Sequence, residues 1–91
     1  MIDRPAVARA IAELLRAIGE DTTREGLART PERVAEMYAE IFGGLHEDPR
    51  VLLSGGFDEA HEEMVVLRDI RLQSVCEHHL LPFVGTAHVG Y

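Results

Sequence analysis

A short stretch, SVCEHHLLPF at residues 74–83, carries the side chains of this chain that are best suited to metal chemistry. It holds the chain's single cysteine, Cys76, and two adjacent histidines, His78 and His79. Thiolate and imidazole are ligands that zinc prefers, and Cys76 and His79 stand in a C-x-x-H spacing. Two ligands do not complete a zinc site, and the sequence offers no second cysteine. Spacing alone therefore leaves open a metal site, or a small buried thiol beside solvated histidines.

Composition and charge indicate a small globular protein and argue against several other classes. The chain has 91 residues, 46% of them hydrophobic, which is typical of a small globular domain. Its formal net charge of −7 argues against a nucleic-acid-binding surface, and no apolar run reaches the roughly 20 residues of a membrane span. One cysteine cannot form an internal disulfide, and residues 1–15 are too charged for a signal peptide, so we expect a cytoplasmic protein.

Two amphipathic helices are predicted before residue 45. The first begins at its cap, Asp3, and ends at Gly19. The second begins in RTPERV, where Thr30 is the expected cap, and ends at Gly43–Gly44. Their apolar stripes are expected to pack against each other or against a sheet. These stripes are Val7, Ile11, Leu14, Leu15 and Ile18 in the first helix, and Val34, Met37, Tyr38 and Ile41 in the second.

The remaining segments predict a turn, a connection and two strands. A short helical turn is expected over Arg24–Ala28, capped by Thr22 or Thr23. Residues 46–63 contain helix breakers and an acidic run at 58–63, so they indicate an irregular, solvated connection. Residues 64–75 and 83–91 are rich in β-branched and aliphatic side chains with partial alternation, which predicts a hairpin with the CEHH segment between its strands. We therefore expect one α+β domain with a helical region (1–45), a connection (46–63) and a hairpin (64–91).

Two separated blocks, REGLARTPERVAEMYAEIFGGL and LQSVCEHHLLPFVGTAHVGY, closely resemble GTP cyclohydrolase I, the zinc enzyme family that opens pteridine and tetrahydrofolate synthesis. The resemblance covers nearly the whole chain and corresponds to roughly the first half of the family's usual length. It implies the tunnelling fold, in which N-terminal helices precede an antiparallel sheet. It also implies a toroidal homodecamer with active sites at subunit interfaces.

The resemblance also implies roles for individual residues. Cys76 and His79 correspond to ligands of Zn²⁺, and the family's third ligand is a downstream cysteine that this chain lacks. Arg33, in TPERV, corresponds to an arginine that reaches the triphosphate of GTP from an adjacent subunit, aided by backbone N–H groups at the start of its helix. His78 would contact the substrate and act as general acid. Glu77 would orient an imidazole or a backbone group, unless it is a solvated carboxylate.

The implied reaction converts GTP to 7,8-dihydroneopterin triphosphate and releases C8 as formate. Attack on C8 leaves negative charge on N7, and His78 would donate a proton there. His46, His61 and His88 match no motif and are expected to be structural or surface residues. We expect the 91-residue chain by itself to be inactive, because the third zinc ligand and most substrate contacts are missing.

Three functions from different classes are compatible with this sequence. The first is GTP cyclohydrolase I. The second is a non-catalytic zinc-binding or regulatory remnant of that family, since the third ligand is absent. The third is a related tunnelling-fold enzyme that acts on another purine or pterin, which the C-E-H-H motif disfavours.

Overall fold

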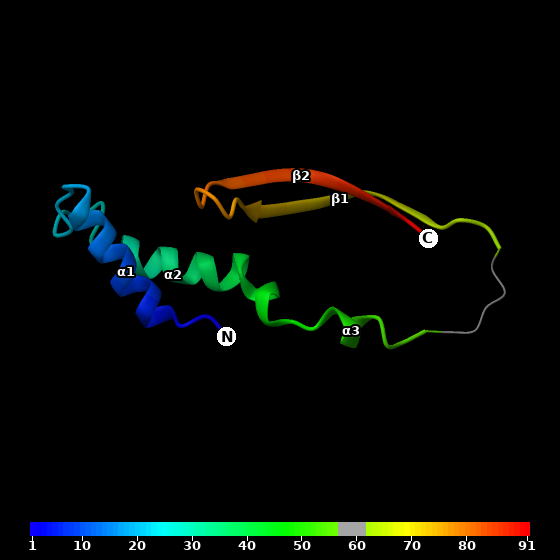
Figure 1. Ribbon diagram of the computed structural model, residues 1–91. Coiled ribbons are helices and arrows are strands. Elements are labelled where there is room, and N and C mark those ends of the chain that lie inside the picture. Colours follow the sequence, from blue (N-terminus) through cyan, green and yellow to red (C-terminus); the bar gives the residue numbers. More distant parts are fainter. Residues whose placement is uncertain (57–61) are drawn as a thin grey trace. The chain divides into compact units, whose positions relative to one another are not determined.

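The computed structural model describes residues 1–56 and 62–91, so the predictions for residues 58–61, including His61, lie outside the described part. The described residues form two compact units, Met1–Asp48 and Pro49–Tyr91. Within these ranges no helix is long and apolar enough to cross a membrane. The elements are α1 (Arg4–Ala17), α2 (Thr30–Ile41), the short 3₁₀ helix η1 (Gly43–His46), α3 (Pro49–Leu52), β1 (Val66–Val75) and β2 (Pro82–Gly90) (Figure 1).

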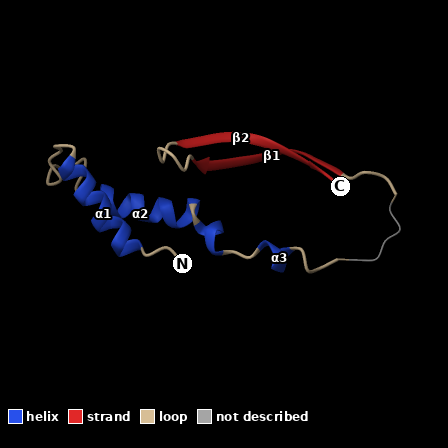
Figure 2. Ribbon diagram, in the orientation of Figure 1, coloured by secondary structure: helices blue, strands red, loops and turns tan. Residues whose placement is uncertain are grey.

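Helices followed by an antiparallel strand pair confirm the predicted α+β class (Figure 2). The predicted connection is not wholly irregular, because η1 and the four-residue α3 interrupt it. Pro49 opens α3, where its missing N–H costs no intrahelical hydrogen bond. The sequence pattern predicts a helix breaker at Pro49, but the proline ring is compatible with the first turn of a helix.

Helix α1 begins and ends as predicted. The Asp3 carboxylate accepts a 3.0 Å hydrogen bond from the backbone N–H of Ala6, which satisfies one of the free donors at the start of the helix. The helix ends at Ala17, and Gly19 follows with a φ of +91°, a left-handed conformation that glycine adopts without a steric penalty. Residues close in sequence decide both boundaries.

The predicted cap of α2 is wrong. Thr30 is the first helical residue, and Arg29 occupies the N-cap position with φ −105° and ψ 2°. A side-chain cap needs an extended backbone at the N-cap. Here the preceding turn leads directly into the helix, because Thr30 N–H already donates to the carbonyl of Leu27 at 3.1 Å. The chain therefore enters α2 through backbone hydrogen bonds.

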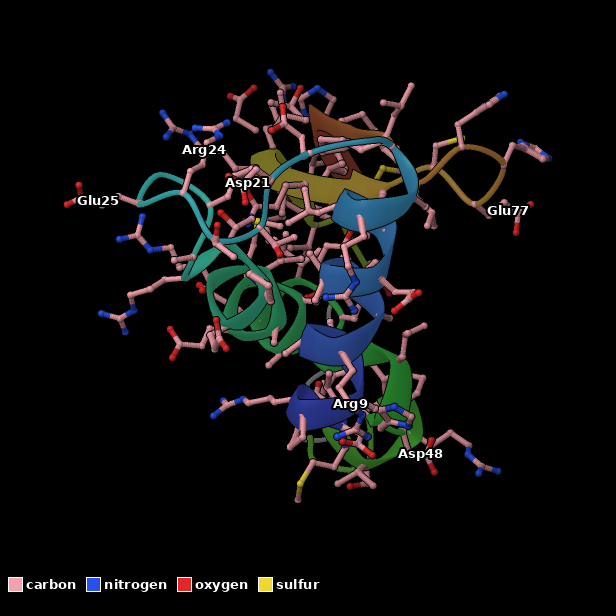
Figure 3. The ribbon with its side chains drawn as sticks, turned by 90° about the vertical axis from the view of Figure 1, so that its left-hand side faces the viewer. Arg9, Asp21, Arg24, Glu25, Asp48 and Glu77 are labelled. Atoms are coloured by element: carbon pink, nitrogen blue, oxygen red, sulfur yellow. The ribbon has the colours of Figure 1, made fainter. Side chains whose placement is uncertain are left out.

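The predicted helical turn over Arg24–Ala28 is confirmed, because the N–H of Ala28 donates to the carbonyl of Arg24 at 3.0 Å, but its predicted cap at Thr22 or Thr23 is wrong. Asp21, and neither threonine, is the acceptor, since its Oδ1 accepts from the backbone N–H (2.9 Å) and the hydroxyl of Thr23. The hydroxyl and then the N–H of Thr23, with the nearby charge of Arg24, lower the pKa of Asp21 below its ordinary 3.8 (Figure 3). Because the folded pKa is depressed, this contribution to stability is present above pH 3.8 and is lost as the pH falls through the folded pKa.

Helices α1 and α2 pack against each other, as one of the predicted alternatives requires. Ala35 of α2 is buried, with 2% of its surface exposed. The prediction is wrong for three stripe residues, because Leu14 (54%), Ile18 (66%) and Met37 (45%) are exposed. Two helices alone share one seam, so side chains beside that seam have no neighbour to cover them.

We predict that Ala35→Leu lowers the free energy of unfolding of the helical unit by about 1–3 kcal/mol, because the added atoms have no space between α1 and α2. Urea denaturation followed by helical circular dichroism measures this change. Ala10→Leu is the matched control, since Ala10 is exposed on α1, and it should change stability by no more than about 0.5 kcal/mol. Equal effects of the two substitutions would contradict this packing.

Strands β1 and β2 pair from Val66 with Gly90 to Val75 with Pro82, close to the predicted hairpin. Most of their side chains are exposed, including Phe83 and Val84. Among the described residues, the buried ones are Pro31 and Ala35 of α2. A two-stranded hairpin is marginally stable by itself, so these apolar faces favour further packing partners.

Candidate metal centre

Residues 76–81 connect β1 to β2, and we call them the CEHH loop. The N–H of Cys76 donates to the carbonyl of Leu81, and the N–H of Leu80 donates to the carbonyl of Cys76, both at 2.8 Å. The second bond closes the same ring as one turn of an α-helix. Leu80 then reverses the chain with a φ of +56°, which is uncommon for a branched side chain. No pattern in the sequence predicted this turn at Leu80.

The side chains of the CEHH loop make a short series of contacts. The half-buried Cys76 places its Sγ 4.0 Å from Nδ1 of His78. Nε2 of His78 lies 3.9 Å from Oε1 of Glu77. The rings of His78 and His79 lie edge to face, with centroids 6.3 Å apart. Four of the five predicted site residues are therefore gathered in one tight loop.

Glu77 and both histidines are exposed to solvent. Figure 3 shows the Glu77 side chain projecting away from the loop. At 3.9 Å and on an exposed surface, its ion pair with His78 would contribute little to stability. The geometry allows Glu77 to orient the His78 ring, which was one of the two predicted alternatives, and it allows the solvated carboxylate as well.

Arg33 is an exposed residue in the first turn of α2, in the helical unit. Its backbone N–H donates to the carbonyl of Arg29 at 3.1 Å, so this N–H is not free for an anion. The expectation that the guanidinium of Arg33 acts together with backbone N–H groups at the start of α2 stays a prediction, although the N–H of Arg33 itself is taken up in the helix. The guanidinium remains the group that it can offer to a phosphate.

The donors of the CEHH loop fit part of a zinc site. A thiol and an imidazole are suitable in type, and Cys76 and His79 are the first and fourth residues of a helical turn, which lie on the same side of it. Among the residues that the structure describes, no group of three His, Cys, Asp or Glu side chains could hold a metal ion. The recorded contact of Cys76 is with His78, so a shared metal on Cys76 and His79 stays a prediction.

Residues 7–91 match the family model described as GTP cyclohydrolase I. The chain is 59% identical over its whole length to "GTP cyclohydrolase 1" of Desulforamulus reducens, covering 49% of that relative. It is 56% identical to the protein of the same name from Acetivibrio thermocellus, again over 100% of this chain and 49% of the relative. The chain thus spans about half the length of the curated relatives it matches.

Proposed function

Because this chain belongs to the GTP cyclohydrolase I family, we propose that it provides the zinc-binding part of a GTP cyclohydrolase I active site. The proposed reaction opens the purine ring of GTP at C8, releases C8 as formate and yields 7,8-dihydroneopterin triphosphate. One structural observation carries the proposal: Cys76, Glu77, His78 and His79 share a loop closed by two 2.8 Å backbone hydrogen bonds. Such a loop presents its side chains in a restricted arrangement, as a catalytic site requires.

Cys76 and His79 are the proposed ligands of Zn²⁺. When bound, zinc acidifies water so that it can attack a stable aromatic ring near neutral pH. The half-buried position of Cys76 limits access of solvent to its sulfur, while the exposed His79 is able to turn toward a metal. A third ligand would come from protein that this chain does not contain, since its sequence has no further cysteine.

His78 is the proposed general acid. As C8 is attacked, negative charge develops on N7, and an imidazole can deliver a proton there. The exposed ring of His78 is accessible to a substrate, and the Glu77 carboxylate 3.9 Å from Nε2 would help to orient it. General acid catalysis of this kind contributes roughly 10²–10⁴-fold to a rate.

Arg33 is the proposed contact to the triphosphate of GTP, through its guanidinium. Its exposed position leaves the planar cation available for a paired contact with phosphate oxygens. The tunnelling fold and a homodecamer are also proposed, because the chain belongs to the GTP cyclohydrolase I family. The exposed apolar side chains of the hairpin support such assembly, because they would be covered by neighbouring strands and helices.

The test joins this chain to the part of the Desulforamulus reducens relative that it does not cover, and we call the product the full-length chimera. We predict that zinc-loaded chimera releases formate from GTP, whereas the 91-residue chain with zinc releases a negligible amount. The reason is that correct positioning of substrate contributes as much as roughly 7–11 kcal/mol to lowering a barrier. A zinc-binding chimera that releases no formate would support the non-catalytic remnant instead.

A further inference from the structure

The hairpin contains a β-bulge at the end far from the CEHH loop. Leu67 pairs with Val89 and Ile70 pairs with Ala87, so His88 of β2 faces both Arg68 and Asp69 of β1. Asp69 has a φ of +57°, in the left-handed region that aspartate tolerates better than most residues. The extra residue turns the N–H of Asp69 away from the regular ladder.

The side chain of His88 accepts a hydrogen bond from this N–H. Asp69 N–H donates to Nδ1 of His88 at 3.0 Å, across 19 positions of sequence. An imidazole nitrogen accepts a hydrogen bond only when it carries no proton, so this contact requires neutral His88 with its proton on Nε2. Protonated His88 would present an N–H toward the N–H of Asp69, and the bond would be lost.

The bulge decides the register at its own end of the hairpin. Removing the extra residue would shift Val66 and Leu67 by one position against β2 and reverse the faces of their side chains. The pairing from Ile70 to Val75 is set at the other end by the CEHH loop, because loop length and turn geometry fix the register of a hairpin. His88 therefore acts at the far end of the hairpin and makes none of the loop contacts described above.

We propose that His88 holds the bulged register of the hairpin as a neutral acceptor, and that its protonation releases the bulge. The inference goes beyond the proposed function, because it depends on the strand pairing and on imidazole chemistry alone. Imidazole changes charge between about pH 5 and pH 8, so the hairpin is most firmly held at the upper end of that range.

Charged groups of both signs lie near His88. Asp69 faces it in the bulge and carries a carboxylate. Arg68 faces it from the same bulge, and Arg71 pairs with Thr86, two residues before His88, so both contribute guanidinium groups. All of these side chains are exposed, so solvent and salt weaken their influence. The geometric requirement for an unprotonated Nδ1 does not depend on that balance.

Nuclear magnetic resonance of the 91-residue chain tests the proposal. At pH 8 we expect nitrogen shifts of His88 with the proton on Nε2 and a slowly exchanging amide at Asp69. On lowering the pH to 5, the protection of that amide, corrected for intrinsic exchange, should fall about tenfold, the effect of losing one hydrogen bond. An unprotected Asp69 amide at pH 8, or protection independent of pH, would overturn the proposal.

Two substitutions distinguish the loss of the hydrogen-bond acceptor at residue 88 from a change in its protonation. His88→Asn retains a side-chain acceptor that does not titrate, so Asp69 should stay protected to the same degree at pH 5 and pH 8. His88→Leu removes the acceptor, so the protection of the Asp69 amide should be low at both pH 5 and pH 8. His46→Asn is the matched control in the helical unit and should keep the pH dependence of the parent chain. Continued pH dependence in His88→Asn would overturn the proposal even if His88→Leu fails to fold.

Discussion

In the full-length chimera, His79→Ala and Cys76→Ala should lose zinc and formate release together, whereas His78→Ala should keep zinc and lose roughly 10²–10⁴-fold of the rate. The two histidines are adjacent, but they are proposed to act differently: His79 as a metal ligand and His78 as a proton donor to N7. Zinc content by mass spectrometry and formate release from GTP, measured on the same samples, distinguish these roles.

His46→Ala is the control for this comparison, because His46 lies in η1, outside the CEHH loop, and should alter neither zinc content nor rate. In the structure Sγ of Cys76 lies 4.0 Å from Nδ1 of His78, the histidine that is not the proposed ligand. The experiment therefore has to distinguish the two histidines. If His78→Ala lost zinc while His79→Ala kept it, the assignments of the two histidines would be reversed. A His78→Ala chimera with the parent rate would remove the general-acid role.

Leu80→Pro in the chimera should lower zinc affinity by about 10–100-fold, although it removes no ligand. Proline lacks the N–H that Leu80 donates to the carbonyl of Cys76 at 2.8 Å, and its ring holds φ near about −65° where the structure has +56°. The turn that places Cys76 and His79 on one side would then be lost. Competition with a chromophoric zinc chelator measures the affinity.

Leu80→Gly is the matched control. Glycine keeps the N–H and readily adopts a positive φ, so this variant should bind zinc within a few-fold of the parent. Similar losses in the two variants would show that the leucine side chain matters and that the backbone turn does not. Unchanged zinc affinity in Leu80→Pro would contradict the proposed role of the turn.

Local sequence was sufficient for several features of this chain. Asp3 and Gly19 mark the ends of α1 because a cap and a left-handed terminator act within one helical turn. The strands were predicted within two residues of their observed starts and ends, since β-branched and aliphatic alternation depends on neighbouring residues. The same patterns placed the CEHH segment between the strands. Its resemblance to GTP cyclohydrolase I was confirmed by the family match.

Other features depended on contacts that local sequence does not contain. Thr30 has the residue type of a helix cap, but hydrogen bonds from the preceding turn displaced it from that position. Leu14 and Met37 belong to apolar stripes, yet the single seam between α1 and α2 leaves them exposed. Only the paired strands bring His88 to the amide of Asp69, because register is a property of two segments 19 residues apart. Sequence by itself determined α1, the two strands and the residue types of the loop, and tertiary pairing decided which backbone and side-chain groups meet.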